Sequence, residues 1–142
     1  MICKNGVPVR NAPNLHEAAF SGDTREASQA LDNGQSPKEF DESGSTAVHK
    51  AAANGHLEVL KLLIQHGGDI ELPDISGCMP LHVAARSGHL TCVKYLVLQG
   101  ADFRLKSKKG NTAMAMAKAN SQQKVAEYLS NCDREKFAWE VV

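Results

Sequence analysis

Two stretches of the sequence decide the fold: Thr46-Ala47-Val48-His49-Lys50-Ala51-Ala52-Ala53-Asn54-Gly55 and Met79-Pro80-Leu81-His82-Val83-Ala84-Ala85-Arg86-Ser87-Gly88. They align residue by residue at a separation of 33, with a histidine, two alanines and a glycine in register. The hydroxyl of Thr46 suits the N-cap of a helix that continues through strong helix formers and ends at Gly55. The pattern predicts a short helix that recurs at a fixed interval.

The same interval relates residues along most of the chain. His16 lies 33 residues before His49, and three glycine series share this spacing. The series are Gly22, Gly55 and Gly88, then Gly34, Gly67 and Gly100, then Gly44, Gly77 and Gly110. A fixed period of this length indicates a repeat protein, in which each unit buries its apolar face against its neighbours.

The second half of each unit has a different pattern. Between residues 57 and 64, Leu60, Leu63 and Ile64 form an apolar stripe at helical spacing, which predicts a second helix. Gly67 follows in the C-cap position. Residues 69–77 are rich in turn formers and predict a β-hairpin finger. One unit is therefore helix, turn, helix and finger.

The 33-residue unit and the segment Met79-Pro80-Leu81-His82-Val83-Ala84-Ala85, close to the pattern T-P-L-H-x-A, resemble the ankyrin repeat family. The resemblance implies an α-rich repeat solenoid, with helix-turn-helix-β-hairpin units stacked in a curved array. Full repeats are expected at 45–77 and 78–110. Degenerate capping repeats are expected at 12–44 and 111–132, between an N-terminal tail (1–11) and a C-terminal tail (133–142). Polar substitutions such as Ser121 suit a terminal unit, which has no further neighbour.

Composition and motifs argue against several functions. The 142 residues carry sixteen basic and sixteen acidic side chains, so no overall basic excess favours nucleic acid. The four cysteines are scattered and predict free thiols, and no apolar run could span a bilayer. We therefore expect a monomer in the cytoplasm or nucleus, without membrane contact.

The recurring histidines do not predict a metal or catalytic site. His16, His49 and His82 would form a ladder along the repeats, and a ladder does not converge on one ion. The resemblance implies instead that each histidine hydrogen-bonds the backbone of its finger and of the adjoining repeat. His56 and His89 suit turn and capping roles. No nucleophile–base arrangement can be built on a linear solenoid, so we expect no enzyme, no catalytic residue, no cofactor and no metal.

The resemblance implies that partners bind at the finger tips and the concave face of the first helices. Carried onto this sequence, the candidate partner-binding residues are Glu39, Phe40, Asp41, Glu42, Leu72, Asp74, Ile75, Arg104, Lys106, Lys108 and Lys109 on the fingers, and Phe20, Lys50 and Arg86 on the helices. Phe40 and Ile75 are the predicted anchors, although Phe40 could pack under the next finger. Phe20 could likewise cover the edge of the cap.

Charge is graded along these repeats. The net charge is −3 over residues 1–44, −2 over 45–77, +5 over 78–110 and zero over 111–142. Complementary charge mainly accelerates encounter and sets register, while buried anchors supply affinity. We therefore expect a non-catalytic adaptor that binds a partner protein. The alternatives are a regulatory or inhibitory subunit, similar to kinase inhibitors or capping-protein regulators of this architecture, and nucleic-acid contact through the basic third repeat.

The tail 133–142 contains Trp139, the only tryptophan. Its charged start and apolar end predict a segment that folds back on the last repeat. A free tail ending in Glu140-Val141-Val142 would instead resemble a PDZ ligand, which binds by strand addition.

Overall fold

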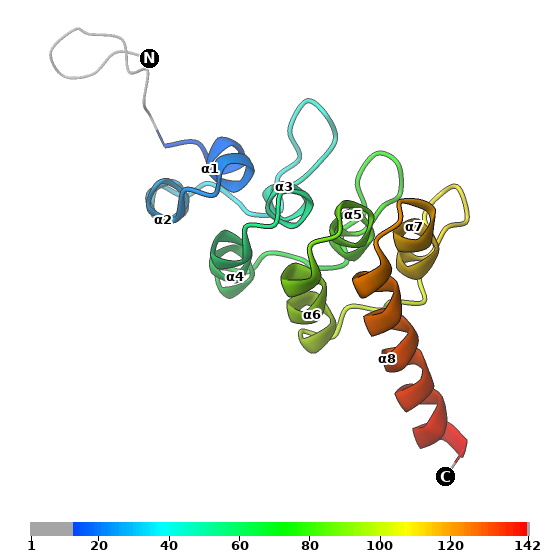
Figure 1. Ribbon diagram of the computed structural model, residues 1–142. Coiled ribbons are helices and arrows are strands. Elements are labelled where there is room, and N and C mark those ends of the chain that lie inside the picture. The colour runs from blue at the N-terminus through cyan, green and yellow to red at the C-terminus, as the bar shows by residue number, and fades with distance from the viewer. Residues whose placement is uncertain (1–12, 142) are drawn as a thin grey trace, which may run out of the picture.

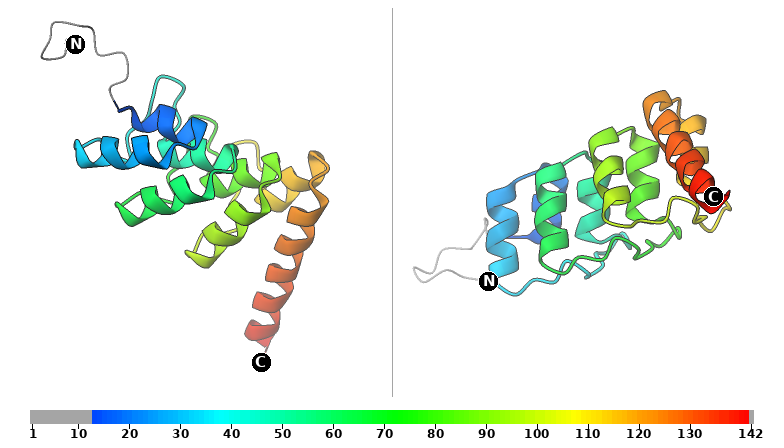
Figure 2. Two further views of the ribbon diagram at one scale, coloured as in Figure 1. Left: turned by 60° about the vertical axis from the view of Figure 1, so that its left-hand side comes forward. Right: turned by 90° about the horizontal axis from the view of Figure 1, so that it is seen from below.

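The computed structural model describes the chain from residue 13 to residue 141, with side chains described as far as Cys132. This part forms eight helices, arranged as four helix–turn–helix pairs in two layers (Figure 1). The first layer contains α1 (Leu15–Ser21), α3 (Ala47–Ala53), α5 (Pro80–Ser87) and α7 (Ala113–Ala119). The second contains α2 (Thr24–Asp32), α4 (Leu57–Gln65), α6 (Leu90–Leu98) and α8 (Gln123–Val141). Two further views show the pairs following one another in chain order (Figure 2).

The helices begin where the sequence offers caps. The side chain of Thr46 accepts a hydrogen bond from the backbone N–H of His49 at 3.4 Å, and Thr112 accepts one from Ala115 at 3.2 Å. In α1 the cap is Asn14, whose Oδ1 accepts from the backbone N–H groups of His16 and Glu17. These bonds satisfy N–H groups that have no partner inside the helix.

Small side chains allow the first-layer helices to pack closely. The alanine pairs of the repeat, Ala18 with Ala19, Ala51 with Ala52 and Ala84 with Ala85, are all fully buried. They lie on α1, α3 and α5, and α3 contacts both of the other two helices. The second-layer helices α4 and α6 contribute larger side chains to the core, and these are fully buried as well: Leu60, Leu63, Val93 and Leu96. The core is therefore continuous from one repeat to the next.

A histidine joins each inner repeat to the following finger. In α3, Nδ1 of His49 lies 3.3 Å from the backbone N–H of Thr46, and Nε2 lies 2.9 Å from the carbonyl oxygen of Cys78. In α5, Nδ1 of His82 lies 2.9 Å from the backbone N–H of Met79, and Nε2 lies 2.8 Å from the carbonyl oxygen of Leu105, which is earlier in the finger than the equivalent of Cys78. Nδ1 must accept and Nε2 must donate, so both rings are neutral. The predicted backbone role of these two histidines is confirmed.

A second series of side chains crosses between repeats and corrects the capping role expected for His56 and His89. Both occupy N-cap positions, but neither makes a side-chain cap bond. Instead, Nε2 of His56 lies 2.9 Å from the carbonyl oxygen of Phe20 in the preceding repeat. Gln122 holds the equivalent position in the last repeat and donates to the carbonyl of Arg86 at 3.3 Å.

These cross-repeat side chains explain why positions 22, 55 and 88 are glycines, because each position lies under a side chain of the next repeat. Gly55 has a φ of +74°, and a Cβ atom built there would lie 2.5 Å from Nδ1 of His89. Ser121 stands where the series would place the next glycine, at a φ of 60°. No side chain of a following repeat lies over it in the described chain, so a Cβ atom is tolerated there.

The expected β-hairpins are absent from residues 13–141, in which the fingers are loops. Two backbone hydrogen bonds of 2.9 to 3.0 Å close each loop. The N–H groups of Asp41, Asp74 and Ser107 donate to Ser45, Cys78 and Asn111, and the N–H groups of Gly44, Gly77 and Gly110 donate back to Asp41, Asp74 and Ser107. Between neighbouring fingers, the N–H of Ile75 donates to Gly44 at 3.1 Å and that of Lys108 to Ser76 at 3.4 Å. Such isolated bonds hold the fingers side by side without forming a ladder.

The C-terminal end also differs from expectation. Helix α8 continues without interruption from Gln123 to Val141, across the expected boundary at 132. The backbone therefore does not turn back as a separate segment but extends away from the repeats (Figure 1). The side chain of Trp139 lies outside the described residues. No helix in the described chain is long and apolar enough to cross a membrane.

Replacing Gly55 by alanine tests the second histidine series. Gly67 is the matched control, because its φ is +90° but a Cβ atom added to it would have nothing within 4 Å. We expect Gly67→Ala to cost about 1 kcal/mol for the left-handed backbone alone. Gly55→Ala should cost at least about 1 kcal/mol more, because the His89 ring must move. Urea unfolding measures both values, and equal losses would contradict the crowding by His89.

Stability should also depend on pH. Burial lowers the pKa of His16, His49 and His82 in the folded chain below the ordinary value of about 6.5. The unfolded chain then binds protons more readily, so stability is complete above about pH 6.5 and is lost as the pH falls below it. Urea unfolding at about pH 7.5 and about pH 5 should show this loss. His82→Gln should make the dependence shallower, and an unchanged dependence in this variant would contradict the role of its buried ring.

Candidate functional site

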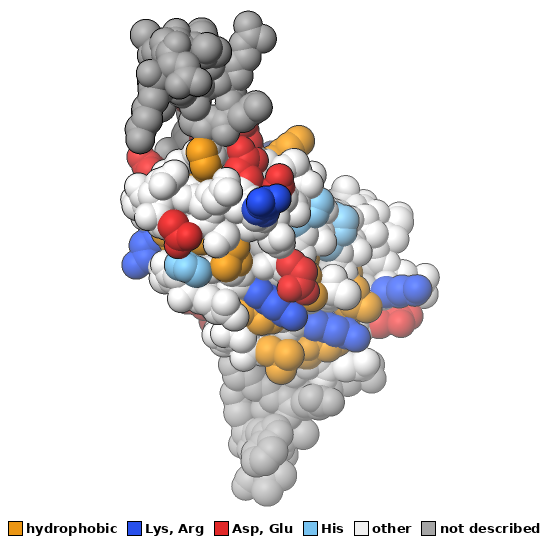
Figure 3. All heavy atoms as spheres, turned by 90° about the vertical axis from the view of Figure 1, so that its left-hand side faces the viewer, with side chains coloured by type: hydrophobic (Ala, Val, Ile, Leu, Met, Phe, Trp, Pro, Cys, Tyr) orange, Lys and Arg blue, Asp and Glu red, His pale blue; other side chains and the backbone are white. Residues whose placement is uncertain are grey.

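A hollow on the N-terminal half lies between the first finger and the first helices of the solenoid. It has a volume of about 840 Å³, and we call it the aromatic groove. Its lining residues are Asn14, His16, Glu17, Phe20, Ser21, Glu26, Phe40, Asp41, Glu42 and Lys50. Figure 3, which views the N-terminal end of the molecule, shows acidic and hydrophobic side chains next to one another on this face.

Two phenylalanines give this groove its apolar surface. Phe20, at the end of α1, is 62% exposed, and Phe40, on the first finger, is 46% exposed. Neither is buried under its neighbours in the described chain, so both side chains are accessible from the groove. Aromatic side chains left open to solvent within a concave surface are typical anchors for a partner.

An ion pair fixes the first finger onto the helix layer. The carboxylate of Asp41 pairs with Lys50 of α3 and accepts hydrogen bonds from the backbone and hydroxyl of Ser43, at 2.9 and 2.6 Å. Partial burial raises the pKa of Asp41, but the bonds from Lys50, Ser43 and Ser45 outweigh it and hold the pKa well below its usual range. Asp41 and Lys50 therefore line the groove as an ion pair whose two charges offset each other.

His16 lines the same groove, but its Nδ1 lacks the bond that this atom makes in His49 and His82. Its Nδ1 is buried without a hydrogen-bond partner. In His49 and His82 this atom faces a backbone N–H three residues earlier, but the equivalent residue here is Pro13, which has none. The start of α1 is held instead by Gln35. Its side chain accepts a hydrogen bond from the N–H of Leu15 at 2.9 Å and donates one to the carbonyl oxygen of Pro13 at 2.6 Å.

A second hollow of about 260 Å³ lies two repeats further along. We call it the basic groove. It is lined by Ser76, Cys78, Arg86, Ser107, Lys109, Asn111, Ala115, Met116, Ala119 and Asn120. Arg86 comes from α5 and Lys109 from the third finger, and no acidic side chain lines the groove. Burial and Asp74 raise the pKa of the Cys78 thiol, while Arg86 and Lys109 oppose this rise.

The structure distributes the remaining predicted residues between the fingers. Ile75 is 69% exposed at the second finger, and Nζ of Lys108 donates to its carbonyl at 2.9 Å. Leu72 is half-buried, and Asp74 accepts from the N–H groups of Ser76 and Cys78, both at 2.9 Å, as a turn residue. Three more predicted residues are exposed on the fingers themselves: Glu39 on the first finger, and Arg104 and Lys106 on the third.

Sequence reasoning missed several lining residues that the repeat register could have found. Phe20 and Arg86 occupy one position of the repeat, whose next member is Ala119. Glu17 and Lys50 occupy another, which leads to Met116. Ala119 and Met116 both line the basic groove. The same register links Asp41, Asp74 and Ser107 as turn residues of the three fingers.

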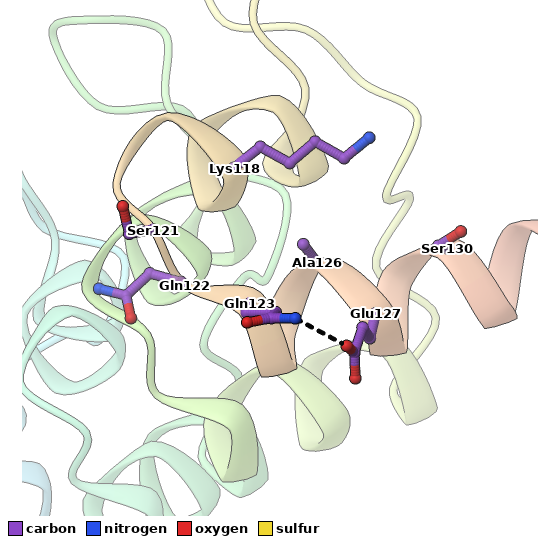
Figure 4. A pocket seen from close by; sticks show the side chains of 7 residues that line it. All are labelled: Lys118, Ser121, Gln122, Gln123, Ala126, Glu127 and Ser130. Carbon is purple, nitrogen blue, oxygen red and sulfur yellow. Dashed lines mark hydrogen bonds between the residues drawn. The ribbon is translucent and has the colours of Figure 1, made fainter.

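A third hollow, of about 500 Å³, lies at the far end between α7 and α8 (Figure 4). Its lining is mainly polar: Lys118, Ser121, Gln122, Gln123, Ala126, Glu127 and Ser130. Nε2 of Gln123 donates to Glu127 at 3.3 Å. This surface is the solvated end face that a terminal repeat requires. Among the described residues no three His, Cys, Asp or Glu side chains are grouped to hold a metal.

Stacked helix pairs, cross-repeat histidines and projecting fingers define a helical repeat protein of the solenoid class. A family model described as "Ankyrin repeats (3 copies)" matches residues 15–107 and 67–138. The chain belongs to the ankyrin repeat family. No curated protein matches it. Ankyrin repeats are generally protein–protein interaction modules and are typically non-catalytic.

The unpartnered His16 nitrogen predicts that Pro13→Thr stabilises the fold. The new backbone N–H can face Nδ1 of His16, as the N–H of Thr46 faces His49. We expect a gain of about 1 kcal/mol in the free energy of unfolding. The same substitution in a His16→Ala background is the control. The gain should disappear there, and an equal gain in both backgrounds would show that the hydrogen bond is not its source.

Proposed function

We propose that the chain is a non-catalytic adaptor that binds a partner protein along the concave face of its first helices and its finger tips. The observation that carries this proposal is the convergence of exposed Phe20 and exposed Phe40 on one groove. Glu17 and Glu42 line the same groove, and neither forms an ion pair with another described residue. Apolar anchors surrounded by solvated charge match the centre and rim of a protein interface.

A regulatory or inhibitory subunit would use the same surface, with an enzyme as the bound partner. We also propose a cytoplasmic or nuclear location. It is supported by Cys78, Cys92 and Cys132, which are free thiols in the structure. Burial raises the pKa of the Cys78 and Cys92 thiols, which suits structural rather than reactive cysteines.

The test is affinity capture from cells with the double variant Phe20→Ser/Phe40→Ser. Leu98→Ser is the matched control, because Leu98 is 78% exposed on α6 of the second layer. Removing the two anchors should weaken binding by at least about 2 kcal/mol, so a captured partner should be lost. The control should retain it, and unfolding curves establish that both variants are folded. Identical sets of captured proteins for all three chains would contradict the proposed surface.

A further inference from the structure

Resting on the proposed protein-binding function, we infer that the partner contributes an extended, bipolar segment. Its basic end, carrying Lys or Arg beside an apolar side chain, occupies the aromatic groove. Its acidic end, carrying Asp or Glu, occupies the basic groove. Each end is assigned from the charges and apolar surface that line its groove.

The lining of the aromatic groove favours a cationic ligand group. Four acidic side chains line it, Glu17, Glu26, Asp41 and Glu42, against one base, Lys50. That base is already paired with Asp41, which leaves three carboxylates without an ionic partner among the described residues. Because Phe20 and Phe40 lie among these carboxylates, an aromatic face and a negative field act on the same ligand group. A Lys or Arg flanked by an apolar residue satisfies both.

The lining of the basic groove favours an anionic ligand group. Arg86 is exposed, lies on α5 and has no ion pair with another described residue, and the same holds for Lys109 on the third finger. The amides of Asn111 and Asn120 and the hydroxyl of Ser76 complete a polar rim. Oriented cations and neutral donors around a small hollow favour a carboxylate, which the guanidinium of Arg86 can bind through two hydrogen bonds.

The repeat register sets the distance between the two ends. Phe20 and Arg86 occupy the same position of repeats one and three, so two first-layer steps separate them. Packed helices lie about 8–10 Å apart, which gives roughly 16–20 Å between the two positions. An extended chain rises about 3.3 Å per residue, so roughly five to six residues connect the basic and acidic groups.

The same arrangement disfavours other occupants. A nucleic-acid strand would place phosphates against the carboxylates of the aromatic groove, where like charges repel. A uniformly basic segment would meet Arg86 and Lys109 at the other end, and a uniformly acidic one would meet Glu17 and Glu42. Only a segment with opposite charges at its ends matches both grooves.

The experiment is selection of random 12-residue displayed peptides against the full chain. Wild-type protein should enrich peptides in which Lys or Arg next to an aromatic or aliphatic residue lies about six residues from Asp or Glu. Arg86→Glu/Lys109→Glu should replace the selected acidic position by a basic one. Glu17→Lys/Glu42→Lys should replace the selected basic position by an acidic one. Lys38→Glu/Lys124→Glu, at two exposed lysines outside both grooves, should leave the selected pattern unchanged.

A synthetic copy of an enriched peptide then gives the affinity. It should bind the Arg86→Glu/Lys109→Glu variant at least about tenfold more weakly than wild type, with a smaller difference at about 1 M salt because screening shortens the range of the charges. Enriched peptides that lack paired opposite charges would overturn the bipolar segment while leaving the proposed protein binding intact. If no peptide is enriched, and the Phe20→Ser/Phe40→Ser variant also captures the same proteins as wild type, both proposals fail. Retention of a single-stranded DNA probe in place of peptides would likewise overturn the inference.

Discussion

The structure depends on buried histidines that tie the start of a first-layer helix to the finger that follows it. His49 joins the backbone at the start of α3 to the carbonyl of Cys78, and His82 does the same toward Leu105. Because each ring is buried and bonded at both nitrogens, it leaves no unsatisfied polar group and fixes the position of the following finger. Polar contacts therefore fix each finger on its helix pair, while the buried alanines let neighbouring first-layer helices approach closely.

The two ends of the solenoid show what happens where this pattern is incomplete. At the N-terminal end Pro13 removes one bond of His16, and Gln35 and Asn14 hold the start of α1 instead. At the C-terminal end Ser121 can occupy the left-handed position because no cross-repeat side chain covers it in the described chain. In the second layer the repeat pattern continues into α8. Nζ of Lys94 lies 5.7 Å from the ring centre of Tyr128, as Nζ of Lys61 lies 5.8 Å from that of Tyr95 one repeat earlier.

Periodicity was enough to predict the repeat architecture and the paired helices, whereas the backbone role of His49 and His82 followed from the resemblance to ankyrin repeats. It did not predict the loops, because turn-forming residues specify a chain reversal and not whether a ladder of strand bonds forms on either side of it. The cross-repeat contacts of His56 and Gln122 were also missed, since capping and cross-repeat bonding place a polar side chain at the same point of the sequence. For the site, the sequence identified Phe20, Phe40 and Arg86 as candidates. Their division between two grooves required the structure, because a concave surface is formed by residues from several repeats.

The repeat register separates residues that maintain the scaffold from residues that vary on it. Positions fixed by packing or by hydrogen bonds keep the same chemistry in successive repeats, as the alanine pairs do. The position shared by Phe20, Ala53, Arg86 and Ala119 changes from aromatic to small to cationic to small, which no packing requirement explains. Its first and third members lie in two grooves whose linings carry opposite charge. The side chains of Phe20 and Arg86 are exposed and therefore available for recognition, and because one is aromatic and the other cationic, the two ends of the surface differ in chemistry.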